Sequence, residues 1–138
     1  MARDEKGFKK LFVGHLGTDV HYQHIETGSV GTGIPDTNFC HEGREQWIEF
    51  KVVVGKQVGL MPTQVAWIWK RTKAGGHVWV IARDKYDGVR KGKGDTIYMW
   101  PGAEVREVKE HGVDHPAHGI YHKPFDWPTI MGQLLCGP

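Results

Sequence analysis

The chain has little cysteine and no long apolar run. Its 138 residues include two cysteines, Cys40 and Cys136, which lie far apart and outside any C-x-x-C spacing. This pattern argues against a disulfide framework and predicts a reduced, cytoplasmic protein. Because no stretch is long and apolar enough to span a bilayer and no secretory segment follows Met1, we expect no membrane partner.

Neither sign of charge is in large excess. The chain has 18 Lys and Arg against 16 Asp and Glu, a net charge of +2, so a nucleic-acid partner is permitted but not required. Hydrophobic residues make up 39% and charged residues 25%, which is ordinary for one soluble globular domain of this length. No internal repeat appears, and we expect a single domain over residues 1–138.

The chain does contain an acidic residue and a lysine on one predicted strand. Residues 47–54 are rich in β-branched and aromatic side chains, which favours a strand. Alternation along that strand places Glu49 and Lys51 on one face. The other face is apolar throughout and is expected to contact a core: Ile48, Phe50, Val52 and Val54.

An aspartate precedes the other arm of the same predicted hairpin. Residues 36–40 form that arm, and residues 41–44 suit its loop. With arms of about equal length, Asp36 falls beside Glu49 and Lys51.

These residue types match the chemistry of phosphodiester hydrolysis. Such a reaction uses a cation to neutralise phosphoryl oxygens and to lower the pKa of the attacking water. Mg²⁺ prefers hard oxygen ligands and takes one or two carboxylates. We expect Asp36, Glu49 and the backbone carbonyl of Phe50 to bind it, and Lys51 to hold the water or the scissile phosphate. The plainer alternative is a turn aspartate beside an exposed strand face.

Three motifs carry a resemblance to a known family. Pro35-Asp36 followed by Glu49-Phe50-Lys51 is similar to the PD-(D/E)xK nuclease signature. Together the motifs resemble the VRR-Nuc branch, in particular its small stand-alone phage-type members, the Holliday junction resolvases and endonucleases: Gly33-Ile34-Pro35-Asp36, Trp47-Ile48-Glu49-Phe50-Lys51 and Pro62-Thr63-Gln64.

The resemblance implies a fold and an activity. It implies a restriction-endonuclease-like core, Mg²⁺ with Mn²⁺ as a substitute, and cleavage of DNA. For the small members it implies a homodimer that cuts branched DNA such as Holliday junctions, in the host cytoplasm if a phage encodes the chain. Two alternatives remain open: a restriction or DNA-degrading nuclease acting on linear duplex, and a non-catalytic DNA-binding module that keeps the fold.

The resemblance also implies further site residues. Gln64 lies in the first turn of a helix predicted from Pro62, where it can hydrogen-bond the metal-bound water, Lys51 or a phosphate; its spacing alone would make it an ordinary surface residue. A glutamate of the first helix often joins the metal site in this superfamily. Glu5 is that candidate, although it can equally complement the helix dipole, and Glu26 is its rival.

Two groups of cations are expected to contact DNA phosphates, without sequence readout. One group ends the helix that begins at Pro62: Lys70, Arg71 and Lys73. The other lies in a glycine-rich loop over residues 84–95: Lys85, Arg90, Lys91 and Lys93. A solvated helix face and a solvated hairpin tip explain them equally well.

The pattern of apolar residues predicts an α/β fold of order α-β-β-β-α-β-β-α, a mixed sheet flanked by helices. Helices are expected over 2–16, from Pro62 to the glycines at 75 and 76, and over 124–135. Strands are expected over 19–26, 36–40, 47–54, 77–83 and 96–100. Residues 104–110 fit either a short strand or a short helix. Residues 111–122 are expected to be a loop, and its four histidines have no nearby cysteine to suggest zinc.

Overall fold

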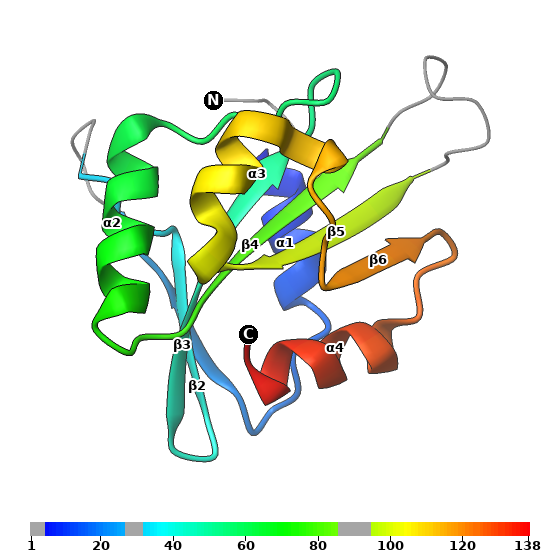
Figure 1. Cartoon of the computed structure of the whole chain (residues 1–138). Coiled ribbons are helices and arrows are strands. Elements are labelled where there is room, and N and C mark those ends of the chain that lie inside the picture. Colours follow the sequence, from blue (N-terminus) through cyan, green and yellow to red (C-terminus); the bar gives the residue numbers. More distant parts are fainter. Residues whose placement is uncertain (1–4, 27–31, 86–94) are drawn as a thin grey trace.

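The computed structural model describes residues 5–26, 32–85 and 95–138. They form one six-stranded sheet, in the order β1-β2-β3-β4-β5-β6, with helices on both faces (Figure 1). The strands are β1 (His21–His24), β2 (Thr37–His41), β3 (Arg44–Val52), β4 (Val78–Asp84), β5 (Thr96–Pro101) and β6 (Gly119–His122). The helices are α1 (Glu5–Val13), α2 (Pro62–Lys73), α3 (Val105–His111) and α4 (Trp127–Cys136), with short 3₁₀ turns η1 (Gly102–Glu104) and η2 (Gly112–Asp114).

The sheet is mixed because of one crossover. Strands β3 and β4 pair in parallel, while the other neighbouring pairs of the sheet are antiparallel. Helix α2 makes the connection between β3 and β4, as parallel neighbours require. Strands β2 and β3 are joined at Glu42 and Gly43, whose φ angles of 50° and 80° suit the tight turn of a two-residue hairpin.

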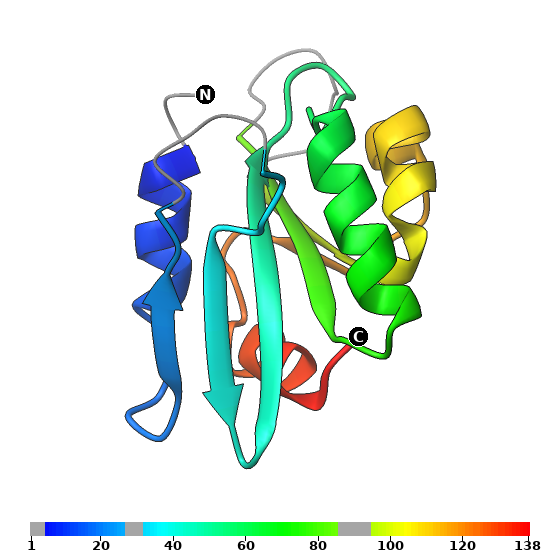
Figure 2. The same cartoon turned by 90° about the vertical axis from the view of Figure 1, so that its left-hand side faces the viewer.

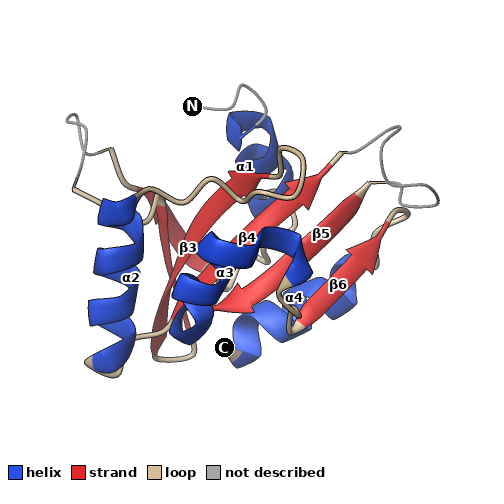
Figure 3. Cartoon of the chain, turned by 45° about the horizontal axis from the view of Figure 1, so that its top comes forward, coloured by secondary structure: helices blue, strands red, loops and turns tan. Residues whose placement is uncertain are grey.

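The sheet is buried on both faces, so the molecule has two cores. Helices α1 and α4 cover one face, where Phe8, Phe12 and Phe50 meet edge to face at centroid distances of 5.2–6.0 Å. Helices α2 and α3 cover the other face, around Ile68 and Trp100. Figures 2 and 3 show this layering: α1 and α2 lie on opposite sides of the sheet. The two-sided burial explains the nearly continuous apolar sequence of β4.

The predicted α/β class and the order of the first six elements are confirmed. The sequence α1-β1-β2-β3-α2-β4 is the arrangement expected of a restriction-endonuclease-like core, and β5 and α4 follow as predicted. Ile130 and Leu134 of α4 are fully buried in the first core. The apolar stripe of this helix therefore packs on the core.

Three expectations about local structure need correction or completion. Val54 does not face a core: β3 ends at Val52, and the Val54 side chain is 69% exposed. Residues 119–122 form edge strand β6, where a loop was expected; a polar, histidine-bearing edge strand has no apolar alternation to reveal it. The ambiguous segment 104–110 is helical: Glu104 ends η1, and the rest makes up all of α3 but its last residue.

Within the described ranges, no helix is long and apolar enough to cross a membrane. The predicted DNA-contacting residues Arg90, Lys91 and Lys93 lie outside the described residues, as do the first residues of the expected helix over 2–16.

Candidate functional site

The site lies where β2 begins alongside β3. Thr37, the first residue of β2, pairs with Ile48 of β3, so the preceding residue, Asp36, comes opposite Glu49. The hairpin brings the two acidic residues within electrostatic range, because the charge of Asp36 acts on Glu49.

Glu49 is buried and held by two partners. Its side chain is 5% exposed, and that of Lys51 is 7% exposed. The Lys51 ammonium nitrogen lies 3.5 Å from Glu49 Oε2. Gln64 Nε2 donates to the same oxygen at 3.1 Å. Both contacts converge on one carboxylate oxygen and so orient the group.

Gln64 reaches Glu49 because the start of α2 is fixed against the site. Its Oε1 accepts a hydrogen bond from the backbone N–H of Met61 at 2.8 Å, which satisfies a free donor at the helix start. Gly33, with φ of 77°, lies so close that an added Cβ would stand 2.1 Å from the Thr63 carbonyl oxygen. The segment before Asp36 therefore packs on the first turn of α2. Gln64 contacts Glu49 itself, a partner that its expected set did not include.

The Asp36 carboxyl is also held from several sides. Thr37 Oγ1 donates to its Oδ1 at 3.0 Å, and the backbone N–H of Phe50 hydrogen-bonds it. Burial nevertheless raises the pKa of Asp36 from 3.8 to about 6, against the opposing effect of the Lys9 ammonium and these hydrogen bonds. Lys9 on α1 is thus within electrostatic range of Asp36.

Glu49 is affected more strongly. Burial, and next the negative charge of Asp36, raise its pKa from 4.5 to about 8, although Lys51 opposes the rise. The negative charge of Asp36 therefore disfavours the ionised form of Glu49. A cation bound between them would remove that repulsion.

Of the two rival extra acids, Glu5 belongs to this electrostatic group. Its carboxylate helps to raise the pKa values of Asp36 and Glu49. Burial raises the pKa of Glu5, while Lys51 lowers it. Glu26 lines the same cavity as Asp36 and is exposed, but its charge is not among the influences on either acid.

The donor set fits a hard divalent cation. Asp36 and Glu49 supply carboxylate oxygens, which Mg²⁺ prefers, and two carboxylates with water complete its usual protein sites. The N–H and C=O of one strand residue point to the same neighbouring strand, so the Phe50 carbonyl faces the Asp36 side, as its N–H does. In the described part of the chain, no three His, Cys, Asp or Glu side chains converge into a metal cluster. Glu5 is linked to the two acids through its charge.

The cations of α2 that were predicted to contact DNA lie away from the acids. Lys70, Arg71 and Lys73 occupy the far half of α2, on the order of 10 Å along the helix from Gln64. The Arg71 guanidinium lies 4.6 Å from the Trp67 ring centre and 5.6 Å from that of Trp47, and Lys73 lies over Trp69 at 5.2 Å. Lys85 is exposed just past β4. The first three share the last turn of α2, and none of the four is among the charges that shift the pKa of Asp36 or Glu49.

Sequence reasoning missed two residues of the site. Lys9 lies one helical turn after Glu5, and this i, i+4 spacing could have indicated that the two side chains share one face of the helix. Thr37 follows Asp36 directly, but a threonine in a strand carries no signal of its own.

No family model matches this chain, and no curated protein sequence matches it. Among solved structures, one similar chain is Hjc from Archaeoglobus fulgidus, described as a Holliday junction resolvase from an archaeal hyperthermophile. The superposition has a TM-score of 0.46 and 14% sequence identity, over 72% of this chain and 73% of that one. The proposals below rest on the site's own geometry and on the sequence motifs.

Proposed function

We propose that this protein is a divalent-metal-dependent endonuclease that hydrolyses DNA phosphodiester bonds, as the PD-(D/E)xK resemblance implies. One observation carries the proposal. At the end of one β-hairpin, burial raises the pKa of both Asp36 and Glu49, the charge of Asp36 raises that of Glu49 further, and the Lys51 ammonium lies 3.5 Å from Glu49. Strongly shifted titratable groups in contact with one another are a feature of catalytic sites.

Asp36 and Glu49, with the Phe50 carbonyl, would hold Mg²⁺, or Mn²⁺ as a substitute. When bound, such a cation neutralises phosphoryl charge and lowers the pKa of a coordinated water. Lys51 places a positive charge beside the reacting group, where it can orient a water molecule or a phosphoryl oxygen. Gln64 keeps the Glu49 carboxylate in one orientation, which is a positioning role.

Branched DNA, such as a Holliday junction or a flap, is the substrate we propose within this class, acted on by a homodimer. Both statements depend on the resemblance of the three sequence motifs. A nuclease on linear duplex and a non-catalytic DNA-binding module are the competing functions. The intact pair of acids with its lysine favours catalysis over the last of these.

The test is a cleavage panel. Purified protein is incubated with a four-way junction, a flap, a single strand and a plain duplex, with Mg²⁺ or with EDTA. We expect Mg²⁺-dependent cleavage, strongest on the junction or flap, and none by Asp36→Ala or Glu49→Ala at unchanged folding and DNA binding. Glu45→Ala is the matched control, because Glu45 is an exposed glutamate at the other end of β3. Full activity in Glu49→Ala would refute the assignment.

A further inference from the structure

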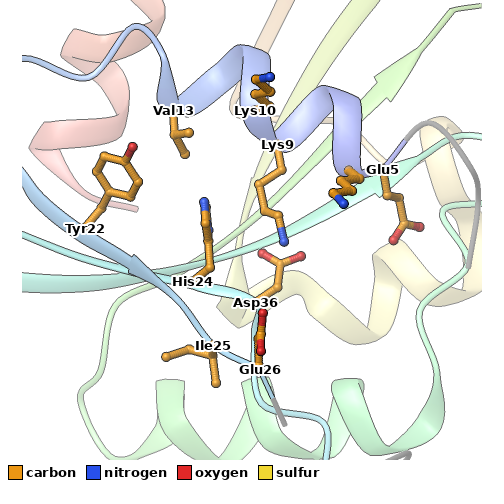
Figure 4. A pocket seen from close by; sticks show the side chains of 10 residues that line it. Glu5, Lys9, Lys10, Val13, Tyr22, His24, Ile25, Glu26 and Asp36 are labelled. Carbon is orange, nitrogen blue, oxygen red and sulfur yellow. The ribbon is translucent and has the colours of Figure 1, made fainter. Parts of the chain in front are cut away.

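A cavity of about 420 Å³ opens beside Asp36, between helix α1 and edge strand β1. Figure 4 shows Tyr22 at one end, Glu5 at the other and Asp36 between them, with α1 above. This size is within the range of pockets that hold small organic ligands. The proposed hydrolysis uses Asp36 and leaves the rest of this groove unassigned.

The α1 wall of the groove is cationic. Lys6, Lys9 and Lys10 line it, and the Lys9 side chain extends from α1 toward Asp36 (Figure 4). The acidic lining residues, Glu5, Glu26 and Asp36, gather at the other end from Tyr22. A ligand that bridges the two ends would therefore carry its negative charge near the lysines.

The β1 wall is aromatic and is tied to the site. Tyr22 is 40% exposed, and its ring lies 5.6 Å from that of His24 between centroids. His24 Nδ1 is 3.1 Å from Thr37 Oγ1, and the same hydroxyl donates to Asp36. This chain of contacts holds the two rings at a fixed place relative to the proposed reaction centre.

We propose that the groove between α1 and β1 holds one nucleotide of an unpaired DNA strand next to the phosphodiester to be cut. Its phosphate contacts the lysine wall, and its base stacks on Tyr22. Lysines along a backbone path and an aromatic ring for each base are the usual elements of single-strand recognition. A base inside a duplex is already stacked and cannot lie on Tyr22, so the groove favours substrates with unpaired nucleotides beside the cut. This inference rests on the proposed nuclease function.

The test measures strand binding without metal or cleavage. Binding of fluorescein-labelled hexathymidylate in EDTA is followed by fluorescence anisotropy at several salt concentrations. We expect Tyr22→Ala to weaken binding by roughly fivefold or more, whereas Tyr22→Phe binds like the wild type because the ring is kept. Replacing Lys6 and Lys10 together by Ala should reduce the salt slope by about 0.7 per lost phosphate contact.

Matched controls come from the opposite edge of the sheet. Ile120→Ala removes an exposed apolar side chain from edge strand β6, and Lys123→Ala removes an exposed lysine that follows it. Both should bind hexathymidylate like the wild type. Thermal unfolding of each variant establishes that it is folded.

Unchanged affinity in Tyr22→Ala overturns the inference. If the lysine variant weakens binding while Tyr22→Ala does not, the strand is held by simple charge attraction. Either result leaves the proposed nuclease function intact if the wild type cuts DNA. Conversely, if the protein binds hexathymidylate through Tyr22 but cuts no DNA, the nuclease function is refuted, while the groove remains a binding site for an unpaired strand.

Discussion

Gln64 on α2 donates a hydrogen bond of 3.1 Å to Oε2 of Glu49 on β3, the same oxygen that lies 3.5 Å from the Lys51 ammonium. The two donors come from different elements, and only the packing of α2 on the sheet brings them together. Because Glu49 is buried and its pKa is raised to about 8, these contacts stabilise its ionised form, the form that binds a cation.

Gln64→Ala should reduce cleavage without destroying the site. Loss of a residue that orients a metal ligand typically costs about 10–100-fold in metal affinity or activity. The variant also leaves the Met61 N–H without its acceptor, so stability should fall by about 1 kcal/mol. Single-turnover cleavage and thermal unfolding measure the two effects. Thr63→Ala, an exposed neighbour in the same helical turn, should change neither; wild-type cleavage by Gln64→Ala would exclude the positioning role.

Gly33→Ala should damage both stability and activity. Gly33 and Gly59 have nearly the same φ, 77° and 76°, but an added Cβ meets the Thr63 carbonyl oxygen at 2.1 Å in the first case and nothing within 4 Å in the second. Gly59→Ala should therefore cost about 1–2 kcal/mol from backbone strain alone. Gly33→Ala should cost about 2 kcal/mol more, because backbone must move, and it should shift the segment that leads into Asp36 away from the start of α2. Urea unfolding measures the free energy of unfolding of both variants. Equal losses would show that the Thr63 carbonyl moves away from the added Cβ at little energetic cost.

The stability of the metal-free protein should fall as the pH rises from about 4 to about 8. The native pKa values of Asp36 and Glu49, about 6 and about 8, lie above their ordinary values of 3.8 and 4.5. Both groups bind protons more tightly in the native state, so their stabilising contribution is complete below the unfolded pKa and is lost as pH passes through the native pKa. Unfolding in EDTA across this range measures the effect.

The control for this pH dependence is the double variant Asp36→Asn, Glu49→Gln, which lacks both titrating groups. The free energy of unfolding of the wild type, relative to that of the variant, should fall as the pH rises. A constant difference across the range would contradict the raised native pKa values of the two carboxyls.

Mg²⁺ should raise the melting temperature of the wild type. A ligand that binds only the native state at ten times its Kd adds about 1.4 kcal/mol to the free energy of unfolding. Glu49→Gln should lose most of this gain, and Glu45→Gln should keep it. Differential scanning fluorimetry over a Mg²⁺ and Mn²⁺ titration is the measurement, and EDTA should reverse the stabilisation. An equal shift in Glu49→Gln would place the cation elsewhere.

Local sequence predicted much of the fold. The strand over residues 47–54 was expected from its β-branched and aromatic side chains, and observed β3 covers most of it. The helix from Pro62 was expected from its start and stop signals, and α2 begins there. Strand β6 was not predicted because an edge strand needs no apolar alternation. Val54 was wrongly assigned to the core because β3 ends two residues before it.

The sequence alone indicated that Asp36 lies near Glu49 and Lys51, because a short hairpin loop joins arms of about equal length. The two-residue turn seen at Glu42 and Gly43 fixes the register. The sequence also determined that Glu49 and Lys51 share a face, because side chains alternate along a strand. Tertiary structure decided which helices complete the site. Lys9 approaches Asp36 from α1 and Gln64 approaches Glu49 from α2, since the sheet buries both faces and each helix covers a different one. Such contacts depend on how apolar faces pack across the whole chain, and no local pattern encodes that packing.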